Sequence, residues 1–314
     1  MIPIDIKAKT INLPENDNHH IVIITANGLK HKCFALKIQK HFPDLVIAYY
    51  ELDSSIVVNG KENELENQLK TSKSRNIKQD LLSYYEVFGI KNTIIKIFTE
   101  IKSKLIERKY NKIKSDSEKN IFSSEYDMLK KYRSLEPIKI HPSEINSLEI
   151  IAAIKECDPY FILTLGGPLY SEALFKTAKG LTINQHAGHS PLYKGTRTTE
   201  WALYNRKLKY VSNTVHITAS GADSGAILKR SNPCIFPSDN YGDIINRVVA
   251  LGTELMIEVV EEIIENKKIT IFEQNKYEGE TFLAKDLNIK KTKFIFNDFK
   301  NNWLQAELES NRNY

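Results

Sequence analysis

Residues able to carry out acyl-transfer chemistry gather between positions 184 and 225. Asn184 and His186 stand two residues apart at the end of an apolar segment. Because side chains on an extended strand repeat every two residues, the amide and the imidazole point the same way. The glycines and the proline that follow break regular structure and wrap a loop around this opening. A second strand at 213–217 leads into the loop that holds Asp223, so we predict that the three side chains share one site.

Acyl transfer to an amine makes three demands on such a site. A neutral amine must attack, negative charge must build on the carbonyl oxygen, and a proton must leave the nitrogen. His186 can exchange protons near neutral pH or donate to the developing oxyanion, depending on its protonation state. Asn184 can donate its amide N–H without titrating, which is worth about 10²–10³-fold in rate in comparable sites. Asp223 could hold an ordered water, set the charge of His186, or accept a proton through that water.

The order and spacing of these residues resemble the formyltransferase family, which moves a formyl group from N10-formyltetrahydrofolate to an amine. In that family an Asn-x-His sequence is followed by Pro and Gly, then by a Trp-Ala pair and an Asp-x-Gly. The matching residues here are Asn184, His186, Pro191, Gly195, Trp201, Ala202, Asp223 and Gly225. The resemblance is strong over residues 140–230 and weak over 20–45. Gly188 stands where the family often has Ser, and we interpret this as a change in the loop's local hydrogen bonding.

The resemblance implies the roles of several residues. It makes Asn184, His186 and Asp223 the catalytic triad, with N10-formyltetrahydrofolate as the co-substrate and no metal. In the family the turn after the preceding strand meets the pterin edge with backbone groups, and paired glycines permit such a close approach. The residues assigned to the cofactor in this way are Leu165, Gly166, Gly167, Pro168, Leu169 and Ala222. Tight turns without a ligand are the alternative for the glycines and for the Asp-Ser-Gly stretch.

A strand, a turn and a helix near the N terminus predict a second group of ligand-binding residues. The β-branched run at 21–24 is typical of a strand buried on both faces, and a helix at about 29–41 and a strand at 45–50 follow it. Ligands gather at the carboxyl ends of parallel strands, and a helix N terminus can hold a phosphate. We therefore assign to the acceptor substrate Asn27, Gly28, Lys30 and His31. An ordinary strand-to-helix turn is the alternative.

The loop after the catalytic strand contains further candidates for binding the acceptor. These candidates are His189, Lys194, Arg197 and Thr198. The first could border the amine, and the others could reach phosphate or sugar hydroxyls, with plain solvent exposure as the alternative. His216 could line or support the pocket, and Trp201 is expected to pack in the core.

The alternation of apolar strands and amphipathic helices predicts an α/β fold. We expect a Rossmann-like, mostly parallel sheet with helices on both faces. The catalytic domain would span 1–227, with a helical insertion rich in Lys and Glu at about 61–134. A C-terminal helix and a small mixed α/β extension would occupy 228–314. The lysine-rich faces of the insertion are either solvated surface or a guide for an anionic substrate.

Local signals predict more elements within this fold. Asn146 and Glu149 resemble a capping box at a helix start. The apolar run at 160–165 indicates a buried strand, and a helix is expected at about 171–179. A long apolar stripe beyond Asp243 indicates a helix that packs against the core.

The composition is that of an ordinary cytoplasmic enzyme. Cys33, Cys157 and Cys234 lie far apart, which argues against a disulfide framework or a zinc site. The first 13 residues lack signal-peptide features, and no apolar run approaches the ~20 residues that cross a bilayer. A net charge of +5 is small for 314 residues, so nucleic acid is a weak expectation and an anionic small molecule a better one. We expect no membrane partner and leave a homodimer open.

The acceptor favoured by the sequence is an amino sugar linked to a nucleotide, such as a precursor of a surface glycan. Methionyl-tRNA formyltransferases carry a larger barrel-like C-terminal domain, for which residues 268–314 leave no room, and sugar N-formyltransferases often have abbreviated C-terminal regions. The alternatives are a formyltransferase for methionyl-tRNA or another small amine, and a formyltetrahydrofolate hydrolase. Such hydrolases usually have an additional N-terminal domain, which the 20 residues before Ile21 cannot supply. The intact triad disfavours a non-catalytic binding protein, and the lack of a Gly-x-Gly-x-x-Gly turn disfavours hydride transfer.

Overall fold

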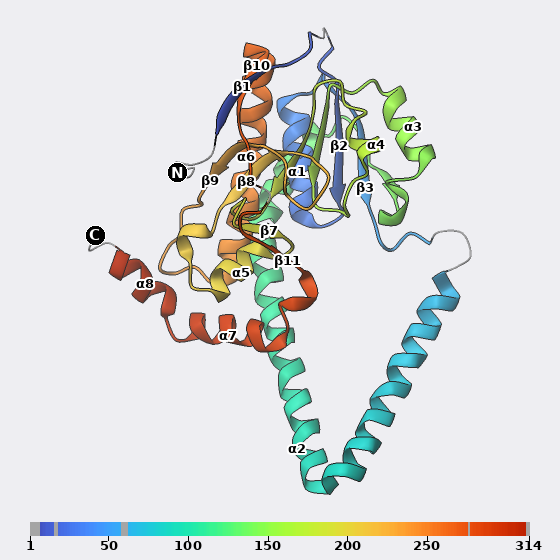
Figure 1. The fold of residues 1–314 in the computed structure, drawn as a ribbon, viewed down its shortest axis with the longest axis vertical. Helices are drawn as coiled ribbons and strands as arrows, with labels where there is room; N and C mark the ends of the chain where they lie inside the picture. The colour runs from blue at the N-terminus through green and yellow to red at the C-terminus, as the bar shows by residue number, and fades with distance from the viewer. Residues whose placement is uncertain (1–6, 16–17, 58–61, 276, 312–314) are drawn as a thin grey trace.

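The computed structural model describes residues 7–15, 18–57, 62–275 and 277–311, with side chains between 62 and 88 described only at 85 and 87. A large mixed sheet forms the body (Figure 1). The strands are β1 (Ala8–Asn12), β2 (Ile21–Ala26), β3 (Val46–Leu52), β4 (Ile138–Ile140), β5 (Phe161–Leu165), β6 (Leu181–His186), β7 (Tyr193–Gly195), β8 (Asn213–Ile217), β9 (Ile227–Ser231), β10 (Lys268–Phe272) and β11 (Glu280–Phe282). The helices are α1 (Leu29–His41), α2 (Glu62–Leu129), α3 (Leu148–Glu156), α4 (Glu172–Phe175), α5 (Thr198–Tyr204), α6 (Tyr241–Asn266), α7 (Ile289–Lys300) and α8 (Trp303–Asn311). No helix in these ranges is long and apolar enough to span a bilayer.

The large sheet has nine strands in the order β1-β10-β9-β8-β6-β5-β2-β3-β4. Neighbours from β6 to β4 are parallel, and neighbours from β6 to β1 are antiparallel. Within this sheet β8 and β10 run against the other strands, so the prediction of a mostly parallel α/β sheet is confirmed. The parallel half places the carboxyl ends of β2, β5 and β6 along one edge, which is where ligands gather in such sheets.

Strand β2 shows why helices cover both faces of this sheet. Its residues from Ile21 to Thr25 are fully buried, and successive side chains point to opposite faces. Ile21 and Ile23 belong to the core that includes residues of α1 and α6. Val22 and Ile24 belong to a second core with residues of α3 and α4. The β-branched run therefore fills two cores at once, and the predicted helices on both faces are confirmed.

The helices near the sheet agree with the sequence only in part. Helix α1 spans the predicted residues. Helix α4 has four residues, whereas the sequence predicts a helix at about 171–179, so that prediction is wrong. The backbone N–H groups of Lys179 and Gly180 donate to carbonyl oxygens just before β5, at 2.9 and 3.0 Å. These bonds to the segment before β5 replace the bonds that a longer helix would need.

The predicted cap at Asn146 is also wrong. Ser147 caps α3, because its Oγ accepts the N–H of Ile150 at 3.3 Å. Asn146 instead accepts the N–H of Ser171 at 2.7 Å and donates to the carbonyl of Leu169 at 2.9 Å. Its amide therefore fastens the turn that follows β5, which matters for the site described below.

The insertion, α2, consists of two helical segments that meet at a kink, and it protrudes from the body and returns to it (Figure 1). The bend lies at Gly89, whose φ of 72° and ψ of 174° are values that glycine adopts without strain. The returning part packs against α1 and α6 and buries Tyr110, Phe122 and Leu129. The predicted start of the insertion, near residue 61, lies outside the described residues. One part of α2 thus projects from the body, and the returning part is packed beside the sheet.

The C-terminal extension joins the body at two places. Strand β10 enters the large sheet between β1 and β9, and β11 pairs in parallel with β7. Trp201, Tyr241 and Phe282 meet in a third core that also includes residues of α7 and α8. Trp201 is therefore a core residue, as predicted. The division of the chain at 227/228 stays a prediction about its organisation.

Candidate active site

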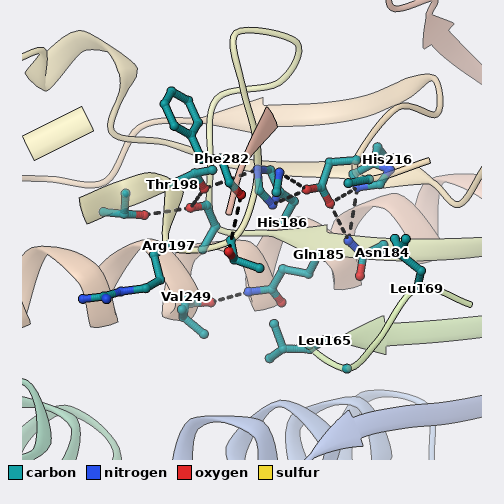
Figure 2. A pocket seen from close by; sticks show the side chains of 18 of the residues that line it. Leu165, Leu169, Asn184, Gln185, His186, Arg197, Thr198, His216, Val249 and Phe282 are labelled. Carbon is teal, nitrogen blue, oxygen red and sulfur yellow. Dashed lines mark hydrogen bonds and ion pairs between the residues drawn. The ribbon is translucent and has the colours of Figure 1, made fainter. Parts of the chain in front are cut away.

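Three neighbouring strands bring the predicted catalytic residues to one edge of the sheet. Asn184 and His186 lie near the end of β6, and Asn184 is in register with Thr164 on β5. Strand β8 runs antiparallel on the other side and pairs His216 with Asn184. The loop after β8 then returns Asp223 to this edge. Figure 2 shows Asn184, His186 and His216 converging there.

Asp223 is the centre of this group. Its Oδ2 lies 3.2 Å from His186 Nδ1 and accepts the backbone N–H of Gly195 at 2.7 Å. Its Oδ1 lies 3.4 Å from Asn184 Nδ2 and 3.3 Å from His216 Nε2. Burial raises the pKa of Asp223, but His186, His216 and the Gly195 N–H outweigh burial and lower this pKa to about 2. The carboxylate is therefore ionised at neutral pH.

His186 lies between two hydrogen-bond acceptors. Its side chain is 6% exposed, and its Nε2 is 2.8 Å from the carbonyl oxygen of Tyr193. The carbonyl oxygen and the Asp223 carboxylate both only accept, so the neutral ring donates its single N–H to one of them, and the other ring nitrogen is the base. Burial lowers the pKa of His186, and the Asp223 carboxylate offsets part of this effect. At neutral pH the ring is thus a base whose protonated form Asp223 would stabilise.

The amide of Asn184 is oriented by Thr164. The Thr164 hydroxyl donates to Asn184 Oδ1 at 2.8 Å, because the amide oxygen only accepts. This leaves Nδ2 to face Asp223 and His216 Nε2, the latter at 3.1 Å. The longer contact, to Asp223, can be exchanged for a ligand oxygen. The sequence analysis missed Thr164, although its place near the end of the strand at 160–165 is a signal that could have found it.

A cavity of about 600 Å³ opens at this edge, and this volume lies within the usual range for ligand pockets. All six residues predicted to bind the cofactor line it, namely Leu165, Gly166, Gly167, Pro168, Leu169 and Ala222. Gly166 and Gly167 have φ values of 73° and 108°. A Cβ on Gly167 would lie 2.6 Å from Tyr170 Oη and 2.8 Å from Leu52 Cδ1. The turn at the cavity wall therefore requires glycine, because a side chain at 167 would collide with its neighbours and both φ values are positive.

The residues predicted to bind the acceptor divide into two groups. Those that line the cavity are Lys30, His31, Arg197 and Thr198. Those that do not line it are Asn27, Gly28, His189 and Lys194. His189 Nδ1 is 3.0 Å from Ser212 Oγ, and Lys194 Nζ donates to the carbonyl of Glu278 at 2.9 Å. These two side chains are used inside the fold, so the structure does not bring them to the cavity.

The cavity also contains charged residues that the sequence analysis did not single out. Lys114 comes from α2 and Glu200 from α5, and their side chains form an ion pair at 2.9 Å. They are 86 residues apart in sequence, so no local pattern links them.

Comparison with known proteins identifies the family. A family model described as Formyl transferase matches residues 55–260, more than half of the chain. The chain belongs to the formyl transferase family. The matched range includes Asn184, His186 and Asp223, so the resemblance seen in the sequence is confirmed at the level of the family.

Relatives of this formyl transferase family member are distant. It is similar to the methionyl-tRNA formyltransferase of Clostridium acetobutylicum, with 29% identity over 164 residues, or 52% of this chain and 50% of the relative. It is similar also to that of Kosmotoga olearia, with 29% identity over 173 residues, or 51% of this chain and 53% of the relative. The chain spans about half the length of the curated relatives it matches.

Solved structures that are similar to this family member share little sequence with it. A sugar N-formyltransferase from a Shewanella species has a TM-score of 0.48 and 14% identity, covering 85% of this chain and 78% of that one. The N-formyltransferase of Helicobacter canadensis, in complex with folinic acid and dTDP-3-aminofucose, has a TM-score of 0.46 and 16% identity, covering 88% and 80%. Such scores carry no argument about the acceptor of this protein.

Proposed function

We propose that this protein transfers the formyl group of N10-formyltetrahydrofolate to the amine of a nucleotide-linked amino sugar, a precursor of a surface glycan. The observation that carries the proposal is the ionised Asp223 in contact with both His186 and Asn184 at the wall of one cavity. Membership of the formyl transferase family supports the donor. The cationic side chains along the cavity support a small anionic acceptor, and three free cysteines support a reducing, cytoplasmic location.

We assign roles to the three residues from their contacts. The bound folate supplies a formyl carbonyl that is open to attack by an amine. We assign the Asn184 amide N–H to the carbonyl oxygen as it becomes negative, an interaction worth about 10²–10³-fold in rate. The unprotonated ring nitrogen of His186 accepts the proton that the attacking amine loses, and Asp223 stabilises the resulting imidazolium. The same proton is then available to the nitrogen that leaves.

The donor's place in the cavity is part of the proposal. We place the pterin between the turn at 166–169 and the loop that precedes Asp223, since residues of both line the cavity. Thr218 also lines it, and its buried hydroxyl has no hydrogen-bond partner within the described structure. An unpaired buried hydroxyl costs free energy, so a ligand that bonds to it gains affinity.

The proposal is tested by incubating purified protein with N10-formyltetrahydrofolate and a panel of acceptors. The panel contains UDP- and dTDP-linked amino sugars and methionyl-tRNA, with one sample left without acceptor, and mass spectrometry detects the formylated products. We expect a formamide on at least one nucleotide-linked sugar. Formate released without any acceptor would instead identify a hydrolase, and the absence of formyl product on every acceptor would refute the proposal.

Methionyl-tRNA is the second candidate acceptor, because the curated relatives named above are methionyl-tRNA formyltransferases. Direct competition between methionyl-tRNA and the best sugar nucleotide in one reaction separates the two. A higher kcat/KM for methionyl-tRNA would replace the sugar by the tRNA and leave the proposed formyl donor unchanged.

The acid side of the pH profile should report His186. Because burial lowers the pKa of His186 from its ordinary value of 6.5, the basic form prevails at neutral pH. We expect kcat/KM to be level near pH 7 and to fall only below about pH 6.5, as the ring becomes protonated. Two acceptors whose amines have different pKa values provide the control. If the pH at which kcat/KM falls differs between them, the fall reports the amine of the substrate. A fall in kcat/KM that begins above pH 6.5 and is the same for both acceptors would contradict the assignment of the acid side of the profile to His186.

A further inference from the structure

Two groups of ion-paired side chains that share helix α2 lie beside the cavity, and four of their five members line it, namely Lys30, Lys114, Arg197 and Glu200. Lys30 Nζ at the start of α1 lies 3.7 Å from Glu118 Oε2 on α2. One turn earlier on α2, Lys114 Nζ lies 2.9 Å from Glu200 Oε1 on α5. Arg197 Nη2 donates to the same oxygen at 2.6 Å. We call these five residues the charge chain.

Glu200 is the buried member of the charge chain. Its side chain is 4% exposed, and both oxygens are bonded, since Arg197 Nε reaches Oε2 at 2.9 Å and the Tyr110 hydroxyl reaches Oε1 at 3.0 Å. Burial raises the pKa of Glu200, but Arg197 and Lys114 outweigh burial and lower it. Arg197 is thus committed to holding Glu200 by two bonds and is poorly placed to be the phosphate ligand that the sequence predicted.

Lys114 stands on a part of α2 that is fixed to the body. The Asn246 amide on α6 donates to the carbonyl of Lys114 at 3.3 Å, and the Ser117 hydroxyl donates to Asp243 at 2.6 Å. The rings of Tyr110 and Tyr241 stack with centroids 4.5 Å apart. A lysine held in this way at the cavity wall has a defined position.

The charge chain has one more cation than carboxylates. Lys30, Lys114 and Arg197 are only 23%, 26% and 28% exposed, so their charges are partly desolvated. His31 lies beside them at the cavity and adds no charge, because burial and Lys30 lower its pKa to about 3. An excess positive charge at the wall of a shielded cavity attracts an anion more strongly than it would in open water.

We propose that Lys114 and Lys30 form a subsite for the phosphate groups of the acceptor, and that the helical insertion is therefore part of the active site. The proposal deepens the proposed function, because it takes the bound anion to be the acceptor's diphosphate. Lysine suits this role as a flexible point charge with three donors. A diphosphate would contact both ammonium groups, and its negative charge would more than offset the excess positive charge.

Binding measurements test this subsite without any turnover. Folinic acid fills the donor side, and calorimetry then measures the affinities of UDP, dTDP and inorganic pyrophosphate for the parent and for variants. Lys114→Met should weaken binding of at least one diphosphate by about tenfold or more, the scale of one charge-assisted hydrogen bond, and Lys114→Arg should largely restore it. Glu118→Gln should tighten binding, because it removes the carboxylate that competes for Lys30. If Lys30 only held Glu118 in place and bound no phosphate, Glu118→Gln would not tighten diphosphate binding.

Lys112→Met is the matched control. Lys112 lies two residues away on the same helix, is 73% exposed and pairs with Asp116, so its loss should change no affinity. The proposal is overturned if Lys114→Met binds every diphosphate as the parent does, if folinic acid affinity falls in parallel, or if the parent binds none of the three probes. If the enzyme formylates an amine that carries no phosphate as well as it formylates a sugar nucleotide, the subsite proposal is overturned and the formyl-transfer activity still stands. Diphosphate binding without any formyl transfer would support the subsite and refute the proposed function.

Discussion

Asp223→Asn is expected to lower kcat for formyl transfer by about 10²–10⁴-fold, the usual contribution of general acid–base catalysis. The substitution keeps the shape of the side chain and removes its charge. His186 then loses the carboxylate that stabilises its protonated form, 3.2 Å from Nδ1. The Gly195 N–H keeps an oxygen acceptor only if the new amide turns its oxygen that way. The measurement is single-turnover formyl transfer at saturating donor and acceptor.

Asp239→Asn is the matched control for this variant. Asp239 is a carboxylate of similar burial, 7% exposed, and its Oδ1 pairs with Arg247 at 2.8 Å, away from the residues that line the cavity. We expect its activity to stay within about twofold of the parent, since it carries no catalytic function. If Asp223→Asn kept activity within a few-fold of the parent while binding folinic acid normally, Asp223 would have no catalytic role.

Gly188→Ala is expected to reduce turnover by about 10²-fold, because the added methyl group occupies the space of the His186 ring. A Cβ at this position collides with His186 Nε2 and Thr198 Oγ1 and lies 2.8 Å from the carbonyl oxygen of Tyr193. That carbonyl is the partner of His186 Nε2, so the ring must turn and lose the bond. Gly188 has no positive φ, so alanine adds a steric effect without backbone strain.

Two measurements separate this effect from a loss of folding. Overpacking costs about 1–3 kcal/mol, so the melting temperature should fall by a few degrees, whereas the variant should stay folded, bind folinic acid as the parent does and lose turnover. Gly89→Ala serves as the comparison: its φ of 72° strains an alanine at the bend of α2, away from the residues that line the cavity, so it should lower the melting temperature without lowering kcat. An active Gly188→Ala variant would show that the loop shifts freely or that His186 is not needed. The same collision gives a physical reason why a residue with a side chain does not fit at 188 in this chain.

Local patterns in the sequence were enough for much of the fold. The run at 21–24 and the helix at 29–41 were predicted correctly, because burial on two faces and helical periodicity are properties of consecutive residues. The two-residue spacing of Asn184 and His186 likewise predicted a shared edge, since the pleat of one strand decides it. The helix at 171–179 failed because the backbone there bonds to carbonyl oxygens just before β5. Those carbonyl oxygens are close in space to the segment at 171–179 but distant from it in sequence.

The sequence by itself determined the chemistry available to the site, an amide, an imidazole and a carboxylate in a known order. Tertiary structure decided which distant residues complete it. Thr164 orients Asn184 from the neighbouring strand, and Lys114 reaches Glu200 across 86 residues. The physical reason is that a buried carboxylate or amide must find partners wherever the packing of helices and strands supplies them. Types of side chain can be read from sequence, but their partners depend on how the elements pack.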